Sequence, residues 1–161
     1  MLRRAVYAGT FDPITLGHID ILRRGCTLFD EVIVAVGHNP AKRTLLDLDT
    51  RLRVIRESTS DLPNLTVGSF SGLLVDYCRK VEATAILRGL RAVTDFEFEF
   101  KIGLANMDMA PEVQTVFLLT EPHLLFISSS LIREIASHDG DVSRYVPAAA
   151  LAALQDALAR S

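Results

Sequence analysis

Residues 9–18 of this chain, Gly-Thr-Phe-Asp-Pro-Ile-Thr-Leu-Gly-His, combine residue types that suit the binding of a phosphate group. Gly9 permits a sharp turn after a short apolar run, and Pro13 stiffens the loop that follows. Gly17 lets a ligand approach the backbone, and His18 stands at the predicted N-terminus of a helix, where free N–H groups favour an anion. Taken alone, His18 could be a solvated residue of a first helical turn. Together with the loop before it, His18 predicts an anion site.

Three other segments place basic or hydroxyl side chains near the predicted ends of strands. Lys42 follows the second strand, in a loop where a solvated lysine is the ordinary alternative. Arg88 and Arg91 bracket Gly89, and such a pair can hold phosphate oxygens in a bidentate manner, although a charged surface turn has the same composition. Ser128–Ser130 open a helix that one serine would cap, so the extra hydroxyls predict a phosphate cradle as the alternative to a plain cap.

Several common catalytic and nucleotide-binding motifs are absent from the sequence. No GxGxxG follows the first predicted strand and no GxxxxGK[ST] occurs, which argues against a dinucleotide-dependent dehydrogenase and a P-loop enzyme. The sequence also lacks an HExxH motif, a Cys/His cluster with metal-ligand spacing and a GxSxG elbow. We therefore expect no resident metal site, and no covalent intermediate is required.

The elements that must position these residues are short apolar runs that alternate with helical patterns. Strands are predicted over residues 5–8, 32–36, 65–70, 84–87 and 113–119. Their hydrophobicity is continuous rather than alternating, which is typical of parallel strands covered on both faces. Thr50 and Thr94 are predicted as helix caps. Helices are predicted over residues 17–29, 50–60, 72–81 and 95–109, from Ser128 or Ser129 to before Gly140, and from Pro147 to the C-terminus.

This order of five β-then-α units predicts an α/β fold, a Rossmann-like, doubly wound five-stranded parallel sheet with helices on both faces. A single domain accounts for residues 1–161, since neither a linker nor an internal repeat is visible. Ligands of such sheets bind at the carboxyl ends of the strands, beside the point where strand order reverses. The four segments described above all follow predicted strands, so we expect them to meet at that point.

Composition narrows the classes of function. Hydrophobic residues make up 49% and charged residues 23% of the 161 positions, which excludes disordered and fibrous proteins. The net charge of −3 argues against a general nucleic-acid-binding surface. No apolar stretch is long enough for a membrane span and no signal peptide is visible, so we expect a cytoplasmic protein that binds no membrane. Cys26 and Cys78 lie in apolar helical contexts and are predicted to be reduced core residues.

Residues 9–18 resemble the signature of the phosphopantetheine adenylyltransferases, members of the nucleotidylyltransferase superfamily with its (His/Thr)-x-Gly-His loop. The resemblance extends over nearly the whole chain, because the segments around Lys42, Arg88–Arg91 and Ser128–Arg133 keep the family's spacing. It implies transfer of the adenylyl group of ATP to 4′-phosphopantetheine, giving 3′-dephospho-coenzyme A and pyrophosphate in coenzyme A biosynthesis. The acceptor phosphate would attack the α-phosphate of ATP directly, in line with the departing pyrophosphate.

The resemblance also implies roles for individual residues. His18 and Thr10 would act on the α-phosphate, and Lys42 on the acceptor and transferring phosphates. Arg91, together with two serines of the predicted cradle, Ser129 and Ser130, would act on the leaving pyrophosphate. The residues implied to bind the acceptor are Thr10, Lys42, Leu74 and Arg88. Those implied to bind ATP are Thr10, Phe11, His18, Gly89, Leu90, Arg91, Glu99, Leu124, Leu125, Phe126, Ile127, Ser128, Ser129 and Ser130.

Some positions depart from the family pattern or have an alternative interpretation. Ala8 replaces a proline that is usual before Gly9, and Leu124 stands where relatives often carry an aromatic side chain that could stack on adenine. Glu99 could be an exposed helix carboxylate instead of an ATP contact. Three further histidines match no catalytic role and are interpreted as surface residues: His38, His123 and His138.

The resemblance further implies ligands and an assembly. Mg²⁺ would be held mainly by the phosphates of ATP, because no carboxylate cluster is evident. Coenzyme A is a candidate inhibitor, and relatives form homohexamers. The alternatives in the same class are a nicotinate-nucleotide adenylyltransferase and a cytidylyltransferase, which usually carry histidine where Thr15 stands. A non-catalytic nucleotide-binding module is the alternative from another class, and it would leave the basic side chains at the strand ends unexplained.

Overall fold

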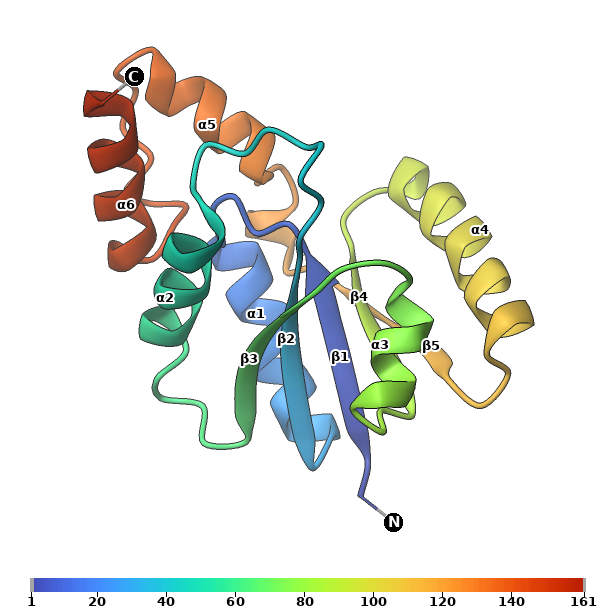
Figure 1. Cartoon of the computed structure of the whole chain (residues 1–161). Helices are drawn as coiled ribbons and strands as arrows, with labels where there is room; N and C mark the ends of the chain where they lie inside the picture. The colour runs from blue at the N-terminus through green and yellow to red at the C-terminus, as the bar shows by residue number, and fades with distance from the viewer. Residues whose placement is uncertain (1, 161) are drawn as a thin grey trace.

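Five parallel strands form one sheet in the computed structural model, which describes residues 2–160 (Figure 1). The strands are β1 (Arg4–Gly9), β2 (Glu31–Gly37), β3 (Leu65–Phe70), β4 (Ala85–Leu90) and β5 (Gln114–Leu119). Their order across the sheet is β3-β2-β1-β4-β5, and all neighbours are parallel. The chain winds from β1 out to β3 and then crosses to the other side of β1, which confirms the predicted doubly wound sheet.

Helices cover both faces of this sheet, as predicted. They are α1 (Leu16–Leu28), α2 (Leu48–Ser58), α3 (Leu74–Lys80), α4 (Val93–Met109), α5 (Ser129–Ser137) and α6 (Ala148–Ala159), with a short 3-10 helix, η1, at Pro122–Leu124. Buried side chains of α1, α2, α5 and α6 belong to one core cluster, and those of α3 to a second. The helix α4 lies beside β4 and β5, where the ring of Phe96 meets Phe117 edge-on (Figure 1).

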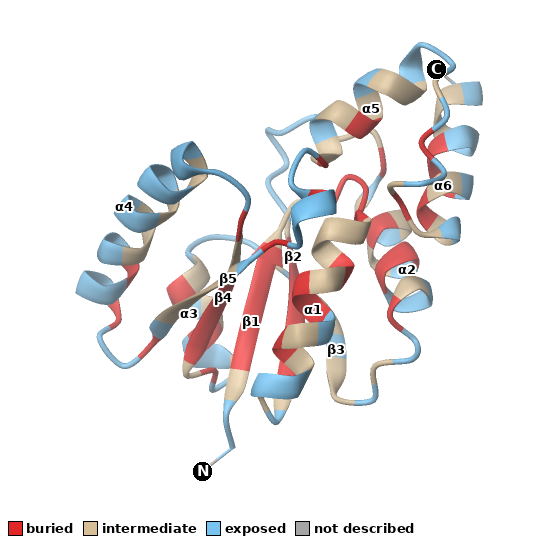
Figure 2. Ribbon diagram, turned by 180° about the vertical axis from the view of Figure 1, so that it is seen from behind, coloured by how far each residue is buried: buried red, intermediate tan, exposed pale blue. Residues whose placement is uncertain are grey.

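The buried residues of the central strands are apolar because these strands contribute to both cores. Along β1, Ala5 and Tyr7 belong to the core that contains α1, whereas Val6 and Ala8 belong to the core that contains α3. Successive side chains of a strand point to opposite faces, so a strand that is covered on both sides has no solvent-facing position. Figure 2 shows this burial along most of β1.

Two predicted helix caps and one strand end differ from the structure. The cap of α2 is Asp47, whose carboxylate accepts the N–H of Thr50, so the helix begins earlier than a Thr50 cap would allow. The helix α4 follows Ala92 without any side-chain cap, and the predicted cap Thr94 lies inside its first turn. The strand β4 continues to Leu90, because parallel pairing with β5 extends to that residue. Arg88 and Gly89 therefore lie within a strand and not in a loop after it.

Several residues away from the sheet edge match their predicted surroundings. Cys26 and Cys78 are free cysteines, the first partly buried and the second buried, as predicted for reduced core residues. The three histidines interpreted as surface residues, His38, His123 and His138, are exposed. Within residues 2–160, no helix combines the length and apolar character needed to cross a membrane.

Candidate active site

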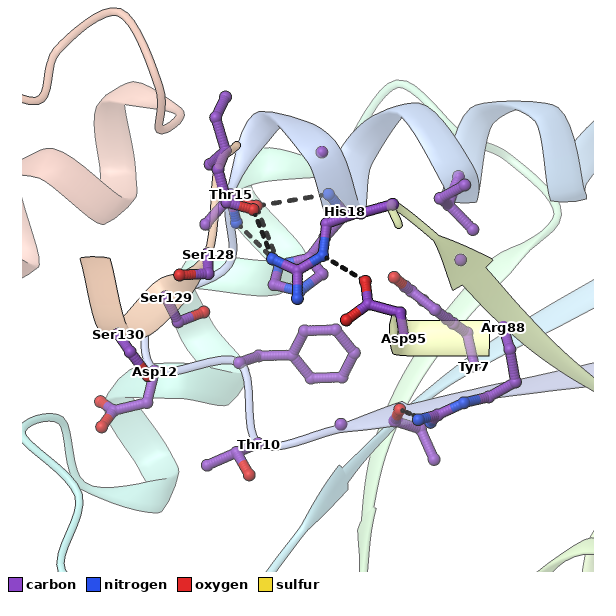
Figure 3. Close-up of a pocket in the computed structure, with 18 of the residues that line it drawn as sticks. Tyr7, Thr10, Asp12, Thr15, His18, Arg88, Asp95, Ser128, Ser129 and Ser130 are labelled. Carbon is purple, nitrogen blue, oxygen red and sulfur yellow. Dashed lines mark hydrogen bonds and ion pairs between the residues drawn. The ribbon is translucent and has the colours of Figure 1, made fainter. Parts of the chain in front are cut away.

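A pocket of about 450 Å³ opens at the carboxyl ends of β1 and β4. These two neighbouring strands lie where the strand order reverses, the place at which doubly wound sheets bind their ligands. The β1–α1 loop, the β2–α2 loop, the first turns of α4 and the N-terminus of α5 contribute to its wall. Figure 3 shows that Thr10, His18 and Arg88 approach this space from different elements. The sequence segments predicted to meet do so.

The imidazole of His18 is fixed by a reciprocal cap at the start of α1. The hydroxyl of Thr15 accepts the N–H of His18 at 3.4 Å, and the N–H of Thr15 donates to Nδ1 of His18 at 3.0 Å (Figure 3). Because Nδ1 accepts a backbone hydrogen bond, the neutral ring carries its proton on Nε2. Nε2 is therefore a hydrogen-bond donor on a side chain that lines the pocket.

Burial lowers the pKa of His18, and the positive charges of Arg91 and Arg88 lower it further, to about 4. The imidazole is thus neutral at physiological pH, although it stands in a pocket that would bind anions. A neutral donor with a fixed tautomer can polarise a phosphate oxygen without first losing a proton. The folded protein binds this proton less tightly than the unfolded chain, so His18 makes folding less favourable as the pH falls from about 6.5 to 4.

We expect the ring of His18 to titrate near pH 4 in the ligand-free protein. NMR chemical shifts of the histidine rings measure this pKa, and His18→Gln identifies the resonance that belongs to this residue. Arg91→Met should raise the pKa of His18, because a repulsive positive charge is removed. A His18 resonance that titrates near 6.5 would contradict the buried, cation-flanked environment.

Two aromatic rings hold His18 from the side of the sheet. The ring of Phe11 meets the imidazole edge-on with a centroid distance of 5.1 Å, and Tyr7 contacts Phe11 at 5.5 Å. Phe11 adopts a positive φ of 48°, which is costly for an aromatic residue and places its ring over Gly9. A Cβ at Gly9 would lie 3.0 Å from that ring, so this glycine makes room for Phe11, and the positive φ of this segment falls at Phe11 and not at Gly9.

The arginines that were predicted to bind phosphates are held by carboxylates of α4. Arg88 donates through Nε to Glu99 Oε2 at 2.6 Å and through Nη2 to Oε1, and its Nη1 donates to the carbonyl of Ala8 at 3.1 Å. Arg91 donates to Asp95 Oδ2 at 3.2 Å and to a main-chain carbonyl near α5 at 2.8 Å. Glu99 lines the pocket, and its carboxylate orients an arginine there.

Lys42 and Ser129 both contact the β1–α1 loop. Lys42 is exposed, and its Nζ donates to the hydroxyl of Thr10 at 3.1 Å. Ser128 caps α5 by accepting the N–H of Leu131. For this serine the structure therefore shows the helix cap that was the alternative to a phosphate cradle. The hydroxyl of Ser129 donates to the carbonyl of Pro13 at 2.8 Å and ties α5 to the β1–α1 loop. The backbone N–H groups of Ser129 and Ser130, the first two residues of α5, have no acceptor within the helix and can face a ligand.

Most of the predicted site residues line the pocket, and a few lie elsewhere. Those that line it are Thr10, Phe11, His18, Lys42, Arg88, Gly89, Arg91, Glu99, Ile127, Ser128, Ser129 and Ser130. Leu124 is buried in the core, while Leu125 and Phe126 are exposed, and Phe126 packs edge-on against Tyr145. Leu90 is buried, and Leu74 packs against the core of α3. The pocket does not include these five side chains.

Gly17, expected to let a ligand approach the backbone, lines the pocket. Sequence reasoning gave no role in the site to several other residues that line it: Tyr7, Asp12, Thr15, Ile21, Arg43, Thr44, Asp95, Thr120 and Arg133. Asp95 had a usable signal, because it stands four residues after Arg91 and one turn before Glu99 on a predicted helix. Arg133 could also have been found from the sequence, since it stands one helical turn after Ser130. No sequence signal pointed to Tyr7, because a tyrosine inside a buried strand is usually a core residue.

The sequence of this chain is similar to a known family of nucleotide-transferring enzymes. The profile of the cytidylyltransferase-like family matches residues 6–135. A phosphopantetheine adenylyltransferase from Heliobacterium modesticaldum is 53% identical over 152 residues, covering 94% of this chain and 90% of the relative. Those of Caldanaerobacter subterraneus subsp. tengcongensis and Shouchella clausii are 51% and 46% identical, covering 91% and 99% of this chain and 91% and 100% of the relatives.

Among solved structures, a Vibrio parahaemolyticus protein assigned as a nicotinate-nucleotide adenylyltransferase has a similar fold. The TM-score is 0.76, and the match covers 100% of this chain and 97% of the other. The sequences are only 18% identical, so this likeness concerns the fold.

Proposed function

Because this chain belongs to the phosphopantetheine adenylyltransferases, within the cytidylyltransferase-like family, we propose that its pocket transfers an adenylyl group through the residues described above. The chain is a nucleotidyltransferase that joins the adenylyl group of ATP to 4′-phosphopantetheine, giving 3′-dephospho-coenzyme A and pyrophosphate in coenzyme A biosynthesis. The observation that carries the proposed mechanism is the donor Nε2 of His18 in one pocket with Lys42, Arg88 and Arg91.

In the proposed reaction an oxygen of the acceptor phosphate attacks the α-phosphorus of ATP. A P–O bond to the acceptor forms while the P–O bond to pyrophosphate breaks, and the electron pair of that bond leaves with pyrophosphate. His18 donates through Nε2 to an α-phosphate oxygen, and the hydroxyl of Thr10 lies beside the same phosphate. Catalysis then consists of positioning two anions and offsetting the negative charge that develops between them.

The remaining basic groups divide between the two substrates in this proposal. Lys42 donates to Thr10 and reaches the acceptor and transferring phosphates. Arg88 contacts the acceptor phosphate with the N–H groups that Glu99 and the carbonyl of Ala8 leave free. Arg91 lies against the carbonyl of Ile127 beside the N-terminus of α5, which supports its assignment to the leaving pyrophosphate together with Ser129 and Ser130.

We propose that Mg²⁺ enters with ATP as part of the substrate and lowers the charge repulsion among its phosphates. The donor set of the pocket does not fit a dedicated metal cage. Within residues 2–160, no three acidic, histidine or cysteine side chains cluster to hold a metal ion. The pocket carboxylates of Asp12, Asp95 and Glu99 are each engaged with an arginine.

A hexameric assembly and inhibition by coenzyme A are further proposals that follow from the family. The exposed aromatic side chains of α4, Phe96, Phe98 and Phe100, support contact with a second copy of the chain. Coenzyme A contains the whole of the product, which supports competition for this pocket. We also propose that the protein is located in the cytoplasm, and the free thiols of Cys26 and Cys78 support this, because thiols stay reduced there.

The division of the pocket predicts different binding losses for the two ligands. Lys42→Ala and Arg88→Ala should weaken phosphopantetheine, since each removes a charge-assisted hydrogen bond worth about 1.5–3 kcal/mol, or roughly tenfold to a hundredfold in affinity. Ser129→Ala combined with Ser130→Ala should mainly weaken ATP and pyrophosphate. Isothermal titration of each ligand against each variant measures this.

Lys80→Ala is the control for loss of one positive charge, because Lys80 is exposed at the end of α3 and lies outside the pocket. It should bind both ligands as the wild type does. Equal losses for both ligands in every pocket variant would overturn the division into acceptor and ATP halves.

A further inference from the structure

The buried carboxylate of Asp12 joins two loops of the pocket. Asp12 lies in the β1–α1 loop and is 3% exposed. Its Oδ1 accepts the N–H of Leu46 at 2.9 Å, and its Oδ2 accepts the N–H of Leu45 at 2.9 Å. Both carboxylate oxygens are therefore committed to the β2–α2 loop, the segment that carries Lys42. Figure 3 shows the carboxylate directed away from His18.

The same residue connects this pair of loops to α5. Nη1 of Arg133 donates to the main-chain carbonyl of Asp12 at 2.6 Å and lies 3.7 Å from its Oδ2. Ser129 reinforces the attachment by donating to the carbonyl of Pro13. The helix whose N-terminus faces the pocket is thus attached to the loop at two consecutive residues.

A second arginine faces this cluster from α2. Arg51 is 3% exposed, and its guanidinium donates to the carbonyl of Thr10 at 2.8 Å and to the carbonyl of Asp47 at 3.4 Å. Burial lowers the pKa of Arg51, and the negative charge of Asp12 acts against that effect. Asp12 therefore offsets the charge of two guanidinium groups, those of Arg51 and Arg133, while it accepts two backbone hydrogen bonds.

We propose that Asp12 is a positioning residue that fixes Lys42 and Thr10 relative to each other for adenylyl transfer. The proposal rests on the proposed function, in which Lys42 acts on the transferring phosphate. Asp12 itself acts at a distance: its carboxylate fixes Leu45 and Leu46, these fix the β2–α2 loop, and the loop sets where Nζ of Lys42 lies. Arg51 holds the carbonyl of Thr10 from the other side.

The substitution Asp12→Asn tests this with the smallest change in shape. An amide cannot accept from both Leu45 and Leu46, because its NH₂ group would face one of the two N–H donors, and it carries no charge for the guanidinium groups. We expect kcat to fall about tenfold or more while KM for ATP changes less than about threefold, since the lost alignment matters most in the transition state. Asp47→Asn, an exposed cap in the same segment, is the matched control and should keep wild-type kcat.

A double-mutant cycle separates positioning from general support of the fold. If Asp12 acts through Lys42, then Asp12→Asn should lower kcat by less than about threefold in a Lys42→Ala background. An equal loss of kcat in both backgrounds would overturn the proposal, as would wild-type kcat for Asp12→Asn alone. Wild-type kcat for Lys42→Ala would overturn the role proposed for Lys42 and, with it, the inference about Asp12. The Lys42→Ala variant alone shows this outcome, so it is distinguished from a failure of the inference about Asp12.

Circular dichroism and the melting temperature establish that Asp12→Asn is folded before kcat is compared. If this variant does not fold, Arg133→Met takes its place in the cycle. Arg133 is partly exposed, and its replacement removes the positive charge beside Asp12 and the hydrogen bond to the carbonyl of Asp12. The expected result is again a fall in kcat that is mostly absent in the Lys42→Ala background. A fall of the same size in both backgrounds would count against the proposal.

Discussion

Replacing His18 by alanine is expected to lower kcat by about 10²–10³, a loss of roughly 2.7–4 kcal/mol, by analogy with removal of an oxyanion donor. The imidazole is neutral, its Nδ1 accepts the N–H of Thr15, and its remaining donor belongs to a side chain that lines the pocket in which we propose that the α-phosphate binds. The donor is fixed before substrate binds, so its removal costs more in the transition state than in the ground state. Pyrophosphate release under saturating ATP and phosphopantetheine measures kcat.

His18→Gln is the informative companion of this variant. Glutamine keeps an N–H donor on a side chain of similar reach, so it should retain more of kcat than alanine does. Both variants should be folded by circular dichroism, because the side chain of His18 lies beside the pocket and not in the core clusters. Near-wild-type kcat for His18→Ala would contradict the assignment of this residue to the α-phosphate.

Pantetheine without its phosphate is expected to bind about 10²–10³ times more weakly than phosphopantetheine. Two cations, Lys42 and Arg88, would each lose a charge-assisted hydrogen bond, and Arg88 would lose it inside a partly buried site. Titration calorimetry of both compounds gives the ratio. The double variant Lys42→Ala and Arg88→Ala should bind the two compounds with much more similar affinities, because both cations assigned to the acceptor phosphate are removed. A large preference that persists in the double variant would place the phosphate site elsewhere.

Nicotinate mononucleotide tests the other part of the acceptor. It also carries a phosphate, but its rigid ribosyl ring differs from the flexible pantetheine arm, so little or no dinucleotide should form from it. Chromatography after incubation with ATP and Mg²⁺ detects either product. Comparable turnover of the two acceptors would leave adenylyl transfer in place and overturn the selectivity for pantetheine.

The fold could be predicted from the sequence because its signals are local and repeated. The apolar run at Val32–Val36 carries its own evidence of a strand covered on both faces, and β2 extends it by one residue at each end. The helix caps were harder to predict. Asp47 and Thr50 are both good caps, and the choice between them depends on where the helix packs. The end of β4 at Leu90 depends on pairing with β5, a partner that no local pattern reveals.

The site could be predicted as a set of segments but not as a network of contacts. Residue types and spacing were enough to bring His18, Lys42 and Arg88 to one edge of the sheet. The partners of these groups come from other elements: Glu99 reaches Arg88 from α4, and Asp12 holds backbone groups of a distant loop. A carboxylate that satisfies backbone N–H groups 33 and 34 residues away has no sequence signature.

The pairing of the pocket arginines with carboxylates has a consequence for the anions that surround the enzyme in a cell. Arg88, Arg91 and Arg133 each lie beside a carboxylate, so the ligand-free pocket offers a small anion much less net charge than its arginines would suggest. Inorganic phosphate, which has no other group to anchor it, gains little by entering. ATP and phosphopantetheine bring further contacts through adenosine and the pantetheine arm, and these compensate for disturbing the pairs. We therefore expect inorganic phosphate alone to occupy the ligand-free pocket only weakly.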